Sequence, residues 1–90
     1  MIRVVHCKRE RYTHYIGRPS VFGNPHRITK TVTRGEAIRR FETYARNSPE
    51  VAWAIYDLPA DAVLGCWCDP DACHGDMIVK LWQEFHPEES

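Results

Sequence analysis

Two short runs of apolar residues lie near opposite ends of the chain, and each predicts a strand. Residues 2–7 are rich in β-branched side chains, which favours a strand at the start of the chain. Residues 62–68 are almost without polar side chains. Such a run is typical of a strand that is buried on both faces.

Three other segments repeat apolar residues at spacings of three and four, which is the period of an amphipathic helix. The first covers residues 33–47, where Thr33 is suited to be the N-cap and Glu36 follows three residues later. The second covers residues 48–58, and the third runs from residue 74 or 75 to residue 85. We therefore expect three helices, two of them before the second strand.

A long segment between the first strand and the first helix, residues 8–28, resists regular structure. Glycine and proline recur in it at close intervals, which leaves room for no more than a brief strand at residues 15–16. Its aromatic and aliphatic side chains argue against disorder. Ordered loops of this length are usually functional, so we expect this one to pack against the domain and to line a site.

The order strand, long loop, helices, buried strand, helix predicts the α/β class, as a small Rossmann-like layer with a short parallel sheet and flanking helices. We expect one domain over residues 1–86 and an acidic tail over residues 87–90. Ligands of parallel sheets bind outside the carboxyl ends of the strands. This rule places the long loop and the cysteine-rich segment that follows residue 65 at one edge.

Composition narrows the class of protein. The chain has 90 residues, of which 43% are hydrophobic and 27% charged, as expected for one small globular domain. A core of this size is thin, so a metal ion or assembly into a homo-oligomer would add stability. The sequence shows neither a membrane-spanning run nor a signal peptide, which predicts a cytoplasmic protein, in the host cell if it is phage-encoded.

The net charge of zero conceals two oppositely charged halves. Residues 1–46 carry eleven Lys and Arg against three acids, a net charge of +8, and the remainder carries −8. A basic face of this kind suits the phosphates of a nucleotide or a nucleic acid. Alternatively, the two halves interleave in space and neutralise each other.

The segment between residues 65 and 76 holds three cysteines and a histidine, and it has three interpretations. In the first, Cys66, Cys68, Cys73 and His74 are the ligands of a structural Zn²⁺ ion, since they are suitable donors in the right number. In the second, the start of the helix at residue 74 binds an anion and stabilises a cysteine thiolate. In the third, the cysteines are ordinary buried residues, and Asp76 is a cap or a first-turn acid.

The loop before the first helix offers groups that suit a phosphorylated ligand. Gly17 permits close approach of the backbone, while Arg18 and Arg27 carry forked donors for phosphate. Ser20 and Asn24 add neutral hydrogen-bonding groups for a sugar or a base. The alternative is a rigid turn region that only covers the sheet.

Five stretches of the chain form one pattern: Tyr15 to Ser20, Gly23 to Pro25, Arg34 to Phe41, Leu64 to Cys68 and Cys73 to Asp76. In these stretches the chain resembles the family of phage and prokaryotic proteins described as domain of unknown function 4326. The resemblance implies a phage-type context and a joint importance of the two segments.

A more distant similarity of arrangement links the chain to Rossmann-like domains that bind nucleotides or cleave N-glycosidic bonds. An enzyme similar to a nucleoside deoxyribosyltransferase would need a carboxylate nucleophile, for which Asp76 or Asp69 is the candidate. This similarity concerns the fold, which does not by itself determine an activity.

Together these features predict a site between residues 17–27 and 73–76 for a nucleotide or for the phosphate or sugar group of a nucleic acid. If the protein is an enzyme, His74 is the expected acid or base, and Cys68 or Asp76 is the expected nucleophile. The alternatives are a zinc-stabilised module without catalysis, which binds nucleic acid or a host protein, and an oligomeric inhibitor or sequestering protein.

Overall fold

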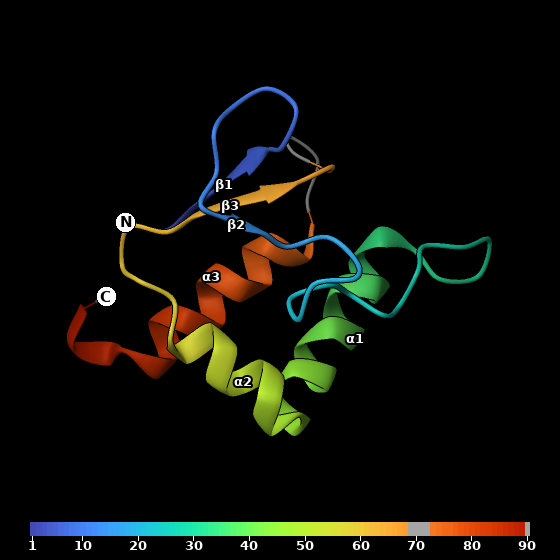
Figure 1. The fold of residues 1–90 in the computed structure, drawn as a ribbon. Helices are drawn as coiled ribbons and strands as arrows, with labels where there is room; N and C mark the ends of the chain where they lie inside the picture. The colour runs from blue at the N-terminus through green and yellow to red at the C-terminus, as the bar shows by residue number, and fades with distance from the viewer. Residues whose placement is uncertain (69–72, 90) are drawn as a thin grey trace.

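The structure is a computed structural model that describes residues 1–68 and 73–89 (Figure 1). The turn expected at residues 69–72, with the candidate Asp69, lies outside the described residues. The elements, in chain order, are β1 (Arg3–His6), β2 (His14–Tyr15), α1 (Arg34–Asn47), α2 (Pro49–Tyr56), β3 (Val63–Cys66), α3 (His74–Phe85) and the short 3₁₀ helix η1 (Pro87–Glu89). The predicted α/β class with a short parallel sheet and flanking helices is confirmed. The finer expectation, that the layer is Rossmann-like, stays a prediction.

The strand order is β1-β3-β2, so that the last strand in sequence occupies the centre. β1 and β2 both run parallel to β3, and Leu64 pairs with Val4 on one side and with His14 on the other. The carboxyl ends of all three strands therefore meet at the same edge of the sheet.

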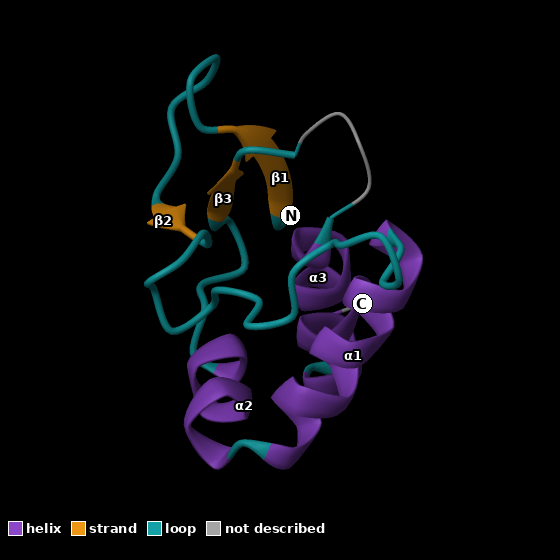
Figure 2. Ribbon diagram, turned by 90° about the vertical axis from the view of Figure 1, so that its right-hand side faces the viewer, coloured by secondary structure: helices purple, strands orange, loops and turns teal. Residues whose placement is uncertain are grey.

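The three α-helices lie on one side of the sheet (Figures 1 and 2). α3 comes closest, because its second residue is Gly75: a Cβ atom there would lie 2.9 Å from Cδ1 of Ile16 and 3.1 Å from Cγ1 of Val4. The missing side chain lets the first turn of α3 rest directly on the strands. No helix within the described residues combines the length and apolar character that crossing a lipid bilayer requires.

Tyr12 covers the central strand at Gly65. A Cβ atom at Gly65 would lie 2.6 Å from Cγ of Tyr12, so the phenol ring packs against the bare backbone of β3. The expected burial of residues 62–68 on both faces holds for Leu64 to Cys66 but is wrong for Trp67, which is 56% exposed. Trp67 follows the last residue of β3, so it lies outside the paired part of the sheet.

The core lies between the sheet and the helices. Its largest fully buried side chains come from every layer: Phe41, Ile16, Ile55, Leu64, Ile78, Leu81, Val5 and Cys66. The long loop contributes Ile16 and Phe22 to this core, as its apolar content predicted, although Val21 stays exposed. The loop is thus anchored from the inside where it passes the carboxyl edge of the sheet.

The two oppositely charged halves meet at Arg46, near the end of α1. Its guanidinium group lies 2.8 Å from Glu42 and 2.7 Å from Glu84 on α3. Within the basic half, Arg3 pairs with Glu10 and Arg40 with Glu36. Interleaving thus occurs at the helical end of the molecule, and it leaves Lys8, Arg9 and Arg11 exposed near the sheet.

Candidate functional site

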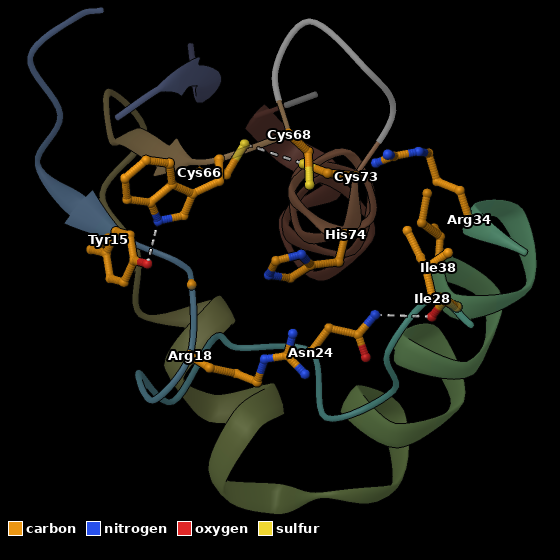
Figure 3. Close-up of a pocket in the computed structure, with 13 residues that line it drawn as sticks. Tyr15, Arg18, Asn24, Ile28, Arg34, Ile38, Cys66, Cys68, Cys73 and His74 are labelled. Atoms are coloured by element: carbon orange, nitrogen blue, oxygen red, sulfur yellow. Dashed lines mark hydrogen bonds between the residues drawn. The ribbon is translucent and has the colours of Figure 1, made fainter. Parts of the chain in front are cut away.

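A cavity with a volume of about 310 Å³ opens at the carboxyl ends of β2 and β3, beside the start of α3 (Figure 3). α1 forms its opposite wall. The lining residues are Tyr15, Gly17, Arg18, Asn24, Ile28, Arg34, Ala37, Ile38, Cys66, Trp67, Cys68, Cys73 and His74. The two segments singled out in the sequence do lie together at this edge, because parallel strands deliver both of them there.

His74 closes one side of the cavity and is bonded to the protein. Its Nε2 atom lies 2.8 Å from the carbonyl oxygen of Ile16, and its ring packs edge-on against Phe41, with centroids 5.0 Å apart. Burial lowers the pKa of this imidazole, and the positive charge of Arg18 lowers it further, against the opposing effect of the Ile16 and Phe22 carbonyl groups and Asp76. A carbonyl only accepts, so the neutral ring donates from Nε2. His74 therefore joins the residue after β2 to α3, and its role as the expected acid or base stays a prediction.

Cys66 and Cys73 form a buried pair. The Sγ atoms of Cys66 and Cys73 lie 3.5 Å apart, and Sγ of Cys73 accepts a hydrogen bond from the backbone N–H of Gly75 at 3.2 Å. Burial raises the pKa of Cys73 to about 12, despite that hydrogen bond. The expected stabilisation of a thiolate at this helix start is wrong for Cys73. Cys68 is half-buried and lines the cavity.

The four expected zinc ligands are not arranged as a metal centre in the described part of the chain. Across residues 1–68 and 73–89, no group of three or more His, Cys, Asp or Glu side chains is placed to hold a metal ion. His74 is engaged with Ile16, and Cys73 with Gly75. The zinc site at Cys66, Cys68, Cys73 and His74 stays a prediction without structural support.

Asp76 acts as a helix cap and does not line the cavity. Its Oδ2 atom accepts the backbone N–H of Cys73 at 3.2 Å, while the Cys73 side chain caps the first turn of α3 in return. This capping box explains the residue without any catalytic role. Among the described lining residues there is neither Asp nor Glu.

The predicted ligand-binding residues divide into two groups. Gly17, Arg18 and Asn24 line the cavity, whereas Arg27 and Ser20 do not. The Ser20 hydroxyl group is buried without a hydrogen-bond partner among the described residues. Asn24 is engaged on both sides: its Nδ2 donates to the Ala37 carbonyl at 3.0 Å, and its Oδ1 accepts from the backbone of His26 at 2.9 Å. Its visible role is to tie the loop to α1.

An aromatic wall forms part of the cavity, and Trp67 is the member that sequence reasoning missed. The indole Nε1 of Trp67 donates to the hydroxyl oxygen of Tyr15 at 2.8 Å, and both side chains line the cavity (Figure 3). Arg34, Ile28 and Ile38 were also missed, and they border the cavity on the α1 side. Arg34 is the first residue of α1, and no local signal in the sequence indicates which segment the first turn of this helix faces.

Comparison with known proteins yields a family but no characterised relative. Residues 3–84 match the model of the family described as Domain of unknown function (DUF4326), as the motifs in both segments indicated. Neither a curated protein nor a solved structure matches the chain.

Proposed function

The chain belongs to the DUF4326 family, and we propose that its cavity binds a nucleotide, with the phosphate at Arg18 and the base against Tyr15 and Trp67. The observation that carries this proposal is the presence of the Arg18 guanidinium group and an aromatic wall in one cavity. Figure 3 shows Arg18 beside Asn24, below His74, whereas Arg34 projects from the start of α1 toward Cys73.

The charge of the lining favours an anion. Arg18 contributes a positive charge, and the described lining residues include neither Asp nor Glu. Arg34 also lines the cavity, but it already has an interaction partner within the protein. A guanidinium group presents forked donors that match phosphate oxygens, and hydrogen bonds between charged partners are stronger than neutral ones. The positive charge of the lining therefore favours a phosphate group over a neutral ligand.

The remaining surfaces suit a planar, partly apolar group. The Tyr15 and Trp67 rings form one wall, and the Ile28 and Ile38 side chains lie on the α1 side. The volume of about 310 Å³ is at the lower end of the roughly 300–1,000 Å³ that is usual for ligand pockets. This size favours a mononucleotide unit over a dinucleotide cofactor.

The proposal concerns binding rather than cleavage of a glycosidic bond. A reaction of the deoxyribosyltransferase type needs a carboxylate nucleophile, and Asp76 is occupied in its capping box outside the cavity. The raised pKa of the Cys73 thiol and the engaged imidazole of His74 also leave these groups poorly suited to attack a substrate.

Titration calorimetry with AMP and dTMP tests the proposal. Adenosine and inorganic phosphate serve as ligands that each lack one half of the nucleotide. Replacing Arg18 with Ala removes a charge-assisted contact of about 1.5–3 kcal/mol and should weaken nucleotide binding by at least about tenfold. Arg27→Ala is the matched control, since Arg27 is exposed in the same loop but does not line the cavity.

Two results would contradict the proposal. One is the absence of nucleotide binding by the folded wild-type protein at millimolar ligand. The other is an equal loss of affinity in Arg18→Ala and Arg27→Ala, which would indicate a diffuse basic surface. Circular dichroism of each variant shows whether the fold is retained.

A further inference from the structure

Aromatic rings continue from the cavity wall across the neighbouring surface. Trp67 contacts His6 edge-on with ring centroids 5.9 Å apart, and it is bonded to Tyr15, whose ring lies 6.2 Å from that of Tyr12. We call these four residues the aromatic platform. Trp67 is 56% exposed and Tyr12 44%, so the two platform members at its outer side offer ring surface to solvent.

The aromatic platform is held rigidly. Tyr12 packs on the bare backbone at Gly65, and the hydrogen bond of 2.8 Å between Trp67 and Tyr15 fixes the relative position of those two rings. These two contacts position the rings in the protein without a ligand. A preorganised aromatic surface loses little conformational entropy when a flat group stacks on it.

Positive charge borders the same platform. The connection between β1 and β2 carries Lys8, Arg9 and Arg11, all exposed, and the ammonium nitrogen of Lys8 lies 5.4 Å from the centre of the Trp67 ring. The one acid of this connection, Glu10, is paired with Arg3 at 3.4 Å. The local charge is thus strongly positive beside the rings.

We propose that the aromatic platform and the β1–β2 connection bind single-stranded nucleic acid, one nucleotide of which occupies the cavity. This inference rests on the proposed function and extends it, because Tyr15 and Trp67 belong to both the cavity wall and the platform. Neighbouring bases stack on the exposed rings, and Lys8, Arg9 and Arg11 contact the phosphates between them.

Unpaired bases are required by this arrangement. Stacking on an aromatic side chain needs a base whose face is open, and that face is covered by its neighbours in a duplex. Aromatic rings interleaved with cations are the usual means of binding single strands without dependence on sequence. The surface therefore discriminates between single and double strands rather than between bases.

Fluorescence anisotropy with a labelled oligothymidylate of about ten nucleotides tests the proposal. We expect it to bind at least about tenfold more tightly than dTMP, measured by competition, and more tightly than the corresponding duplex or a strand of equal length with abasic sites. The abasic strand keeps every phosphate and lacks the stacking bases, so it separates the two contributions.

A charge variant locates the surface. Lys8→Ala combined with Arg11→Ala should weaken oligonucleotide binding about tenfold and lower the salt slope by about 1.4, measured between about 50 and 200 mM salt. It should leave the affinity for dTMP unchanged. Arg39→Ala combined with Lys80→Ala is the matched control, since both residues are exposed on helices and neither lines the cavity.

The outcomes separate the two proposals. If dTMP binds while the oligonucleotide gains nothing over it, or if the duplex or the abasic strand binds equally well, the single-strand proposal is overturned and the nucleotide cavity stands. The same conclusion follows if both double variants lose equal affinity. If neither dTMP nor the oligonucleotide binds, both proposals are overturned. Oligonucleotide binding without any dTMP binding would support the single-strand surface and overturn the proposal that the cavity binds a nucleotide.

Discussion

The Nε2 atom of His74 donates to the carbonyl oxygen of Ile16, so the first residue of α3 is bonded to the residue that follows β2. This contact sets the distance between two walls of the cavity. Because Ile16 is fully buried, the loop cannot shift there without moving this side chain out of the core. His74 therefore determines the shape of the site through its position.

Stability should fall when His74 becomes protonated. Burial lowers the pKa of His74 below its ordinary value of 6.5 in the folded protein, so the unfolded chain binds its proton first as the pH falls. The contribution of this group is complete above pH 6.5 and is lost progressively below it, by at most about 1.4 kcal/mol per pH unit. His74→Gln keeps a donor for Ile16 without titrating.

Urea unfolding midpoints between about pH 7.5 and pH 5 measure this effect. Wild type should lose more stability over the interval than His74→Gln does. Parallel pH profiles of the two proteins would contradict the assignment.

Alkaline conditions should act through Cys73 in the opposite direction. Burial raises the pKa of its thiol from 9.0 to about 12, so between these values the unfolded chain releases a proton that the folded protein retains. Stability from this group is therefore present below pH 9 and is lost as the pH rises. In Cys73→Ser the hydroxyl group should still cap α3 and does not titrate in this range. Between about pH 8 and pH 10.5 the free energy of unfolding should fall more in the wild type than in Cys73→Ser. An equal fall in both proteins would contradict the burial of this thiol.

Removal of the Asp76 carboxylate should affect stability but not ligand affinity. Asp76→Ala breaks one half of the capping box and should cost about 0.5–2 kcal/mol in the free energy of unfolding. The affinity for AMP should stay at the wild-type value, as calorimetry can show. Glu88→Ala, at an exposed acid of η1, is the control for a change of net charge. A large loss of AMP affinity in a folded Asp76→Ala protein would show that this carboxylate contributes to ligand binding and would contradict the prediction.

A methyl group at Gly65 should conflict with Tyr12. The new Cβ atom would lie 2.6 Å from Cγ of Tyr12, near the rigid base of that side chain, so Gly65→Ala should cost about 1–3 kcal/mol. Combining it with Tyr12→Ala removes the clash, and the double variant should be more stable than the two single changes predict. Chemical denaturation of all four proteins gives this coupling energy; simple additivity would show that Tyr12 does not cover Gly65.

Local signals in the sequence were sufficient to locate the main elements. Thr33 caps α1 by accepting the Glu36 N–H at 3.2 Å, as expected from the capping pattern. The third helix begins at His74 and ends at Phe85, within the expected limits. Strand limits were less accurate, since β2 is His14–Tyr15 rather than residues 15–16, because pairing with β3 decides where it begins.

The position of the cavity was predictable, but its chemistry was not. Parallel strands bring residues 17–24 and 73–74 to one edge whatever their side chains are. Which groups are free there depends on contacts between distant segments: Asn24 is used by Ala37, and His74 by Ile16. Trp67 is a second example. Its apolar neighbours in the sequence suggested burial, but β3 ends at Cys66, so Trp67 lies beyond the strand and is exposed.

The central place of β3 has a consequence for the order in which the molecule assembles. β1 and β2 each pair with β3 rather than with each other, although paired residues are about sixty positions apart for β1 and about fifty for β2. While the chain is being synthesised, both edge strands must wait without partners until residues 63–66 have left the ribosome. The helices α1 and α2 can form in that interval, but the sheet cannot. The cavity, whose walls include the ends of β2 and β3, is consequently among the last features of the protein to exist.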